Sequence, residues 1–169
     1  MIYRFLSAGP PTLPLRLKVE INTREHFEVL GFINKSFQIE NQWFSGKVAI
    51  TTHNIEEILA TKLRALYQRR KGRDLFDLDK GLEEISGIDV EKIITCFLEY
   101  MKFSNQRVTR AEFEENIHYK RKDIVFGEDI SPLLSAAVAK EFDLNQAFTN
   151  VANKIISKLP GKPWKAPGQ

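Results

Sequence analysis

Alternating apolar and polar residues near the start of the chain indicate β-strands. Within residues 15–22 every second side chain is apolar, and the side chains between them are polar or charged. Successive side chains of a strand point to opposite faces, so this pattern predicts a half-buried strand. Residues 27–33 and 46–51 are rich in aromatic and β-branched side chains and are predicted as further strands.

From residue 54 onward the apolar residues recur at spacings of three and four, which is the helical pattern. Asn54 followed by Glu57, and Thr109 followed by Glu112, predict capping boxes at two helix starts. Helices are expected from residue 54 to about Gly72, over 74–85, over 90–101, from 109, at Pro132, and over 148–159.

Strands followed by helices predict an α+β fold rather than an alternating βαβ arrangement. We expect a small sheet in residues 1–52, a helical region in residues 53–160 and a flexible tail in residues 161–169. No helix precedes the alternating strand to cover its apolar face, so the sheet is expected to be incomplete. Either the later helices fold back onto it, or an upstream segment is missing.

The composition is that of an ordinary globular protein. Of its 169 residues 43% are hydrophobic and 28% are charged, which suits one domain, or one small domain with an extension. No apolar run reaches the roughly 18 residues that span a bilayer, and no signal-peptide pattern is present. A cytoplasmic protein without membrane contact is therefore expected. The single cysteine, Cys96, lies on the apolar face of a predicted helix and is interpreted as a small core residue.

Basic residues are clustered although the formal net charge is only +3. The clusters lie at residues 64–73, 120–122 and 158–165. Clusters of this kind bind phosphates or nucleic acid in some proteins and form solvated helix faces in others. Charge alone leaves both interpretations open.

Several common catalytic classes have no support in the sequence. The three histidines lack metal-ligand spacing, and a zinc site is not expected with one cysteine. The chain contains neither a glycine-rich phosphate loop nor a Gly-x-Ser-x-Gly elbow. P-loop and serine-hydrolase chemistry therefore have no support in the sequence.

Glu20 and Lys62 are the first candidates for chemistry. Glu20 lies on the polar face of the first predicted strand, where a carboxylate suits Mg²⁺, although one carboxylate does not make a two-metal site. An ordinary exposed glutamate has the same pattern. Lys62 interrupts an apolar stripe, so its ammonium either reaches the edge of the helix or meets an anion such as phosphate.

The segment 71–78 opens the next predicted helix and carries three charged candidates. Asp74 is placed to cap this helix, and Asp77 follows on the same face. Arg73 can pair with either carboxylate or bind a phosphate. Capping with a local ion pair explains these residues. The functional alternative has Asp74 or Asp77 orienting Lys62 or Arg73 toward a substrate.

Two segments resemble the AbiEii/AbiGii toxin family, a branch of the DNA polymerase β-like nucleotidyltransferases. The strand Lys18-Val19-Glu20-Ile21-Asn22 is similar to the family's Lys-x-Asp/Glu strand. Residues 56–78 have a glutamate-rich start, an Ala-x-Lys-Leu core, an arginine-rich turn and an Arg-Asp-x-x-Asp-Leu end, as the family's characteristic segment does. The resemblance extends from about residue 15 to residue 159 and is most specific over this second segment.

The resemblance implies the toxin of a type IV toxin–antitoxin (abortive infection) system that acts in phage defence. Such a toxin transfers a nucleotide from an NTP to an acceptor such as tRNA and has a cognate antitoxin as partner. Its fold is a nucleotidyltransferase-like sheet followed by a helical bundle. By this resemblance the metal ligand for Mg²⁺ is Glu20, the other catalytic residues are Lys62, Asp74 and Asp77, and the phosphate contacts are Lys18, Lys62, Arg69 and Arg73.

One part of the family pattern is missing. The family's Gly-Ser turn and Asp-x-Asp pair are expected upstream of Glu20, but the nineteen residues before Glu20 contain no Asp or Glu, and the first aspartate of the chain is Asp74. Two of three metal carboxylates are therefore absent, and we expect a chain that is inactive alone. A truncated product, a mis-assigned start and a split protein each explain this pattern. The alternative function is a non-catalytic helical module that binds RNA or an antitoxin.

Overall fold

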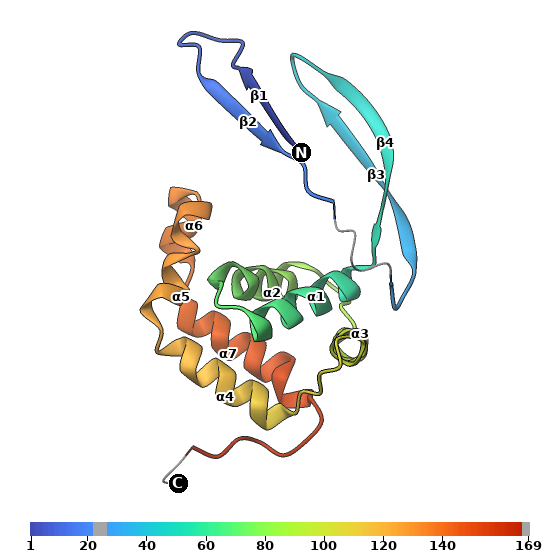
Figure 1. Cartoon of the computed structure of the whole chain (residues 1–169), viewed down its shortest axis with the longest axis vertical. Coiled ribbons are helices and arrows are strands. Elements are labelled where there is room, and N and C mark those ends of the chain that lie inside the picture. Colours follow the sequence, from blue (N-terminus) through green and yellow to red (C-terminus); the bar gives the residue numbers. More distant parts are fainter. Residues whose placement is uncertain (22–26, 167–169) are drawn as a thin grey trace.

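The structure, a computed structural model, describes residues 1–21 and 27–166. Two β-hairpins form one end of the molecule, and a bundle of helices forms the other (Figure 1). The α+β class expected from the sequence is confirmed. The strands within these residues form two separate two-stranded antiparallel sheets, where a single small sheet was expected.

The first hairpin pairs β1 (Ile2–Leu6) with β2 (Pro14–Lys18). The alternating segment is therefore a strand, but it ends earlier than expected. Ile2, the first residue of β1, lies opposite Lys18, and beyond this pair Met1 and Val19 exchange two backbone hydrogen bonds of 2.8 and 2.9 Å. Glu20 lies beyond the end of β2, and Asn22 lies outside the described residues.

The second hairpin pairs β3 (Phe32–Glu40) with β4 (Ser45–His53). The strand expected at residues 46–51 is confirmed, with longer bounds. The side chain of Asn41 accepts hydrogen bonds from two backbone amides of the turn, at 2.9 and 3.0 Å. This local bonding explains why an asparagine occupies the start of the turn.

The strand expected at residues 27–33 is wrong for most of that segment. The backbone amides of Val29 and Leu30 are not available for pairing with a neighbouring strand. They donate hydrogen bonds to the two carboxylate oxygens of Glu57, at 2.7 and 3.0 Å. Gly31 follows with a φ of 76°, far from the extended range. A tertiary contact therefore outweighs the strand preference of the local sequence.

The helices are confirmed as a class, with shifted bounds. They surround a common interior in which α1 packs against α2 and α3, and α2 packs against α7. Short 3₁₀ turns lie at Ser131–Leu133, which contains Pro132, and at Ile156–Lys158. The α-helices are α1 (Ile55–Gln68), α2 (Gly72–Glu84), α3 (Val90–Phe103), α4 (Arg110–Arg121), α5 (Ile124–Glu128), α6 (Ala136–Glu141) and α7 (Leu144–Lys154).

One expected capping box forms and the other does not. Before α4, the Thr109 side chain and the Glu112 carboxylate exchange hydrogen bonds with each other's backbone amides. Before α1, the Asn54 side chain makes no cap and instead donates to the carbonyls of Leu30 and Gly31, at 3.5 and 3.4 Å. The Glu57 carboxylate is bound to the same linker. Asp74 is also not a cap: α2 begins two residues earlier, so Asp74 lies inside its first turn.

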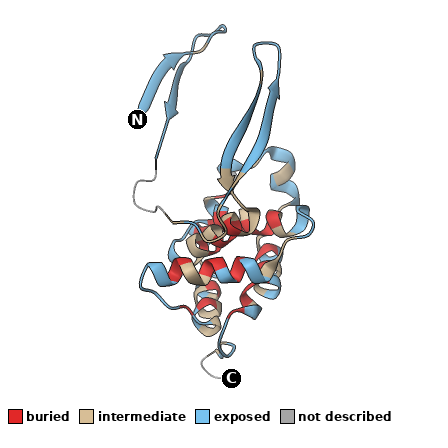
Figure 2. Ribbon diagram, turned by 90° about the vertical axis from the view of Figure 1, so that its right-hand side faces the viewer, coloured by how far each residue is buried: buried red, intermediate tan, exposed pale blue. Residues whose placement is uncertain are grey.

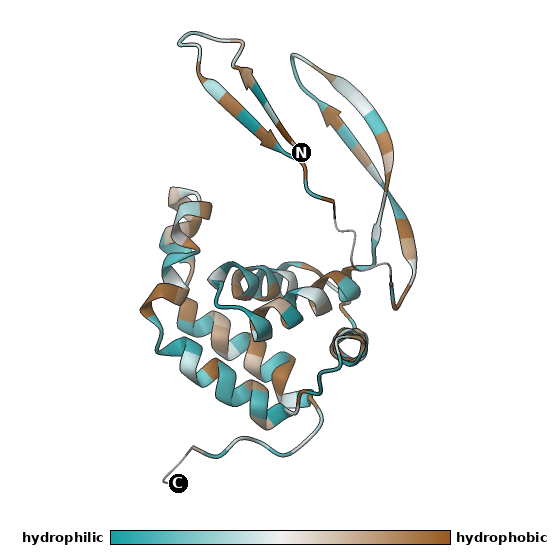
Figure 3. Ribbon diagram, viewed as in Figure 1, coloured by the Kyte–Doolittle hydropathy of each residue, from teal (hydrophilic) through white to brown (hydrophobic). Residues whose placement is uncertain are grey.

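Nearly all buried side chains lie in the bundle (Figure 2). Among the described residues the buried hydrophobic core begins at Leu59. From the hairpin side, Val29 and Leu30 of the linker pack against it and are partly buried, and the Phe27 ring lies edge-on against the buried Tyr100. Cys96 is fully buried there, as expected. Among the described residues no helix combines the length and apolarity needed to cross a membrane. Apolar residues also alternate along both hairpins (Figure 3), where they remain exposed.

Candidate functional site

An ion pair joins α1 and α2 at the surface of the bundle. The Nζ atom of Lys62 lies 2.6 Å from Oδ2 of Asp77. The two side chains are 34% and 40% exposed, so the pair remains open to solvent. An ammonium held in place by a carboxylate of the neighbouring helix retains donors for an incoming anion.

A second ion pair closes the turn between α1 and α2. Arg69 donates from Nε and Nη2 to the two carboxylate oxygens of Asp74, at 2.7 and 2.8 Å. The Asp74 side chain is fully buried, and this bidentate bond together with the aspartate charge raises the pKa of Arg69. Two-point pairing of this kind fixes the arginine in one orientation. Asp74 therefore holds Arg69, where the sequence suggested that it orients Lys62 or Arg73.

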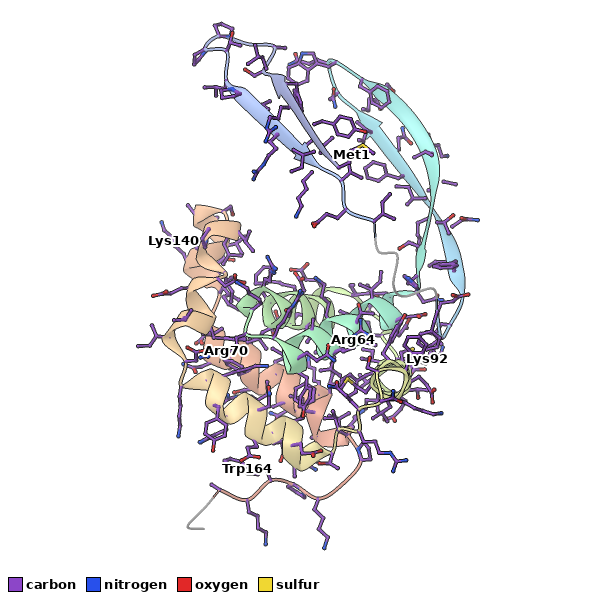
Figure 4. All side chains as sticks on the ribbon, viewed as in Figure 1. Met1, Arg64, Arg70, Lys92, Lys140 and Trp164 are labelled. Carbon is purple, nitrogen blue, oxygen red and sulfur yellow. The ribbon has the colours of Figure 1, made fainter. Side chains whose placement is uncertain are left out.

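The remaining basic residues of this turn also meet carboxylates. Arg70 Nε lies 2.8 Å from Oδ2 of Asp123, which caps α5, and Lys71 Nζ lies 2.8 Å from Oδ1 of Asp129. Arg73 approaches Asp129 more loosely, at 4.0 Å. The hydrogen bond from Lys71 holds the pKa of Asp129 below its ordinary value. Arg70 therefore lies where the turn meets α5 (Figure 4). Through these ion pairs, much of the basic cluster attaches the turn to α5 and the residues that follow it.

Lys120, which the sequence suggested only as part of a surface cluster, is buried. Its ammonium donates to the carbonyls of Leu66, in a short contact, and of Tyr67, at 3.0 Å. Burial lowers the pKa of Lys120 to about 8. A lysine that reaches the last carbonyls of a helix satisfies acceptors that have no partner inside the helix. No local pattern announces this role, because α1 and Lys120 are far apart in the sequence.

Glu57 anchors the second hairpin. Its carboxylate accepts a hydrogen bond from the Tyr100 hydroxyl at 2.7 Å, in addition to the two linker amides, and its side chain is fully buried. Burial alone would raise the pKa of this carboxyl, but the hydrogen bonds outweigh it and hold the pKa below the ordinary value. His53 Nδ1, at 3.6 Å, adds a weaker contact.

The residues near the first hairpin do not form a metal site. Glu20 pairs with Lys18 at 2.6 Å, and their side chains are 75% and 57% exposed. No group of three or more His, Cys, Asp or Glu in the described part of the chain is arranged to hold a metal ion. Since Glu20 is paired with an ammonium and belongs to no such group, the described residues here do not fit Mg²⁺. Its hairpin lies apart from α1 and α2 in both views (Figures 1 and 2).

Comparison with protein families decides the family. The model of the nucleotidyl transferase AbiEii toxin of type IV toxin–antitoxin systems matches residues 2–152. The chain belongs to the AbiEii family. Membership in this toxin family implies an antitoxin partner and a nucleotide substrate, and nucleotidyltransferases use divalent metals. Neither a comparison with curated proteins nor one with solved structures found a match.

In this AbiEii chain six of the seven candidate residues fall into three separate pairs, and Arg73 lies near Asp129 instead. Lys62 meets Asp77 across two helices, Arg69 meets Asp74 within one turn, and Lys18 meets Glu20 beside the first hairpin. Only the first pair joins two candidates from different elements while leaving both partly exposed. The structure therefore brings Lys62 and Asp77 together, and it places the expected metal ligand, Glu20, beside the first hairpin.

Proposed function

We propose that this AbiEii-family chain takes part in nucleotidyl transfer from an NTP to an acceptor, with an RNA such as tRNA as the acceptor, in abortive infection against phage. The observation that supports this proposal is the exposed Lys62–Asp77 pair. A positioned ammonium at a protein surface is suited to the oxygens of a triphosphate, because it supplies several donors to a concentrated negative charge.

Each candidate has a distinct part in this proposal. Lys62 contacts the phosphates, and Asp77 holds it in position. Arg73, which is 45% exposed and only loosely paired with Asp129, offers a second phosphate contact. Arg69 and Asp74 keep the turn between the helices closed, since the buried carboxylate already occupies the guanidinium.

We further propose that the described residues do not carry out transfer by themselves. Two-metal phosphoryl chemistry needs several carboxylates at one place. Among the described residues no such group is arranged to hold a metal ion, and Glu20 is paired with Lys18. No catalytic step is assigned to Glu20 for this reason. Mg²⁺ and the acceptor would have to be positioned by groups other than those described.

NTP binding tests the role of Lys62. Fluorescent analogues of each ribonucleoside triphosphate are titrated into the whole chain, the Lys62→Met variant and a Lys92→Met control. Lys92 also pairs with an aspartate at the surface, at 3.7 Å, and so matches the charge change. Loss of a charged hydrogen bond should weaken binding about tenfold in Lys62→Met only. Absent binding, or equal weakening in both variants, contradicts the proposal.

Transfer is measured separately. The chain is incubated with Mg²⁺, labelled NTPs and total tRNA, beside a Glu20→Ala variant. We expect no label on the tRNA from the unmodified chain. Label that appears, and disappears in Glu20→Ala, would show that the described residues are sufficient and that Glu20 is catalytic.

The alternative is a non-catalytic module that binds RNA or the antitoxin. The lack of a metal-binding group among the described residues favours it over a complete enzyme. Retention of tRNA without NTP binding, unchanged by Lys62→Met, would support this alternative and remove the first.

A further inference from the structure

The β1–β2 hairpin carries an apolar face that no part of the described chain buries. The register places Tyr3 opposite Leu17 and Phe5 opposite Leu15, so these four side chains share one face. Each of them is between 42% and 53% exposed. Continuous apolar surface of this kind marks an interaction site in a soluble protein.

The opposite face of the same hairpin carries three basic residues beside the apolar residues Ile2, Leu6 and Pro14. Arg4 lies directly opposite Arg16, and Lys18, which is paired with Glu20, lies opposite Ile2. The chain contains no Asp or Glu before Glu20, so neither strand contributes a carboxylate to this face. Two like charges directly opposite each other destabilise a hairpin unless an anion lies beside them.

The hairpin also has unused backbone hydrogen-bonding groups. Its sheet consists of two strands, so each strand is bonded along one side only. Free edges of this kind accept a further strand, and two strands alone are marginally stable in water. A hollow of about 360 Å³ lies over three cross-strand pairs of the hairpin, beside both arginines. Its lining residues are Arg4, Phe5, Leu6, Pro14, Leu15 and Arg16.

We propose that an edge of the β1–β2 hairpin binds an extended segment of another polypeptide, in which apolar and acidic side chains alternate. A strand added at an edge directs successive side chains to opposite faces. Its apolar side chains extend the face of Tyr3 and Phe5, and its carboxylates lie beside Arg4 and Arg16. Main-chain hydrogen bonds supply affinity, and the charge pairs select the acidic partner.

A second copy of this chain fits the hairpin less well. Pairing two copies along the same edge brings the arginines of one hairpin next to those of the other, and like charges in adjacent strands repel. A single-stranded nucleic acid also fits less well. It binds by stacking bases on aromatic rings while cations meet its phosphates, but here Tyr3 and Phe5 lie on one face and Arg4 and Arg16 on the other.

Two labelled peptides test the proposal. In one, valine alternates with glutamate, and in the other, valine alternates with lysine. Each is titrated by fluorescence anisotropy into the whole chain, an Arg4→Glu/Arg16→Glu variant and a Lys102→Glu/Lys122→Glu control. The control makes the same charge change at two exposed lysines, Lys102 of α3 and Lys122 just after α4. Circular dichroism and thermal melting verify that the bundle is folded in each variant.

We expect the glutamate peptide to bind the unmodified chain and the control at least tenfold more tightly than the lysine peptide. The Arg4→Glu/Arg16→Glu variant should reverse this preference. Equal affinity for both peptides, or no affinity for either, overturns the proposal. A stable dimer in sedimentation velocity that is lost in Arg4→Glu/Arg16→Glu also overturns it. The same holds if oligouridylate binds through these two arginines while the peptides do not bind.

Discussion

The Tyr100 hydroxyl of α3 donates a hydrogen bond of 2.7 Å to the Glu57 carboxylate of α1. The same carboxylate accepts the amides of Val29 and Leu30 at the base of the second hairpin. One buried side chain therefore joins two helices and the linker that leads into β3. Because the side chain has no exposure, its bonds are not exchanged for water in the folded state.

Replacing Glu57 by glutamine should destabilise the fold. The amide group of glutamine has one acceptor oxygen, so its NH₂ group would face a backbone amide that also donates. An unsatisfied buried donor costs about 1–3 kcal/mol, and we expect a loss of this size in urea unfolding at pH 7. Glu83→Gln, at a side chain that is 45% exposed, serves as the control and should change stability by less than about 0.5 kcal/mol.

The Glu57 contribution should also depend on pH. Its pKa in the folded chain lies below the ordinary value of 4.5, because hydrogen bonds to the ionised form outweigh burial. The stabilisation is therefore complete above that ordinary value and is lost as the pH falls through the lower folded pKa. The stability difference between the unmodified chain and Glu57→Gln should shrink below about pH 4.5. A difference that grows on acidification would contradict this assignment.

Gly72, the first residue of α2, should not tolerate a methyl group. A Cβ atom there would lie 2.4 Å from the carbonyl oxygen of Phe126 and 2.7 Å from the Ile130 side chain. Overpacking costs about 1–3 kcal/mol, which exceeds the helix propensity that alanine adds at a helix end. We expect Gly72→Ala to lower the melting temperature. Gly9→Ala, where the added atom meets nothing within 4 Å, should leave it unchanged.

Lys120 should make the chain more stable at alkaline pH. Burial lowers its pKa from an ordinary value of 10.5 to about 8 in the folded chain. Between these values the unfolded chain binds more protons than the folded chain, so the free energy of unfolding rises with pH. Chemical denaturation from pH 8 to 10.5 should show this rise in the unmodified chain relative to Lys120→Met. Parallel pH profiles would show that Lys120 is not buried as described.

Cys96 should be unreactive in the folded chain. Burial, followed by the charge of Glu57, raises the pKa of its thiol to about 11, and the side chain is fully buried. The thiolate is the reactive form, so alkylation should be slow. Mass spectrometry after iodoacetamide treatment at pH 8 should show labelling at least roughly tenfold slower than in urea. Equal rates would mean that α3 opens readily.

The helices could be predicted from the sequence because their apolar stripes face one interior. The capping box at Thr109 was also predictable, since its partner Glu112 lies one turn away. The box at Asn54 had the same local pattern and failed, because the side chains of both Asn54 and Glu57 bond to the linker before β3. Periodicity therefore identifies elements, while long-range hydrogen bonds decide which local motifs form.

The candidate site was predictable to a smaller extent. The sequence allowed Asp77 to orient Lys62, and the structure pairs them. It also allowed Asp74 to serve Arg73, whereas Asp74 binds Arg69. Residues whose partners are distant in sequence, such as Lys120, could not be assigned, because nothing near them in the chain specifies the acceptor they reach.

Because the buried core lies in the helical bundle, substitutions in the bundle and on the first hairpin have different effects on this protein. A substitution at Phe97, whose side chain is fully buried inside the bundle, changes the stability of the fold. A substitution at Tyr3, which is exposed on the first hairpin, changes the surface that the hairpin presents to a partner. The exposed side chains of the hairpins take no part in the core cluster, so substitutions there remove no core contact.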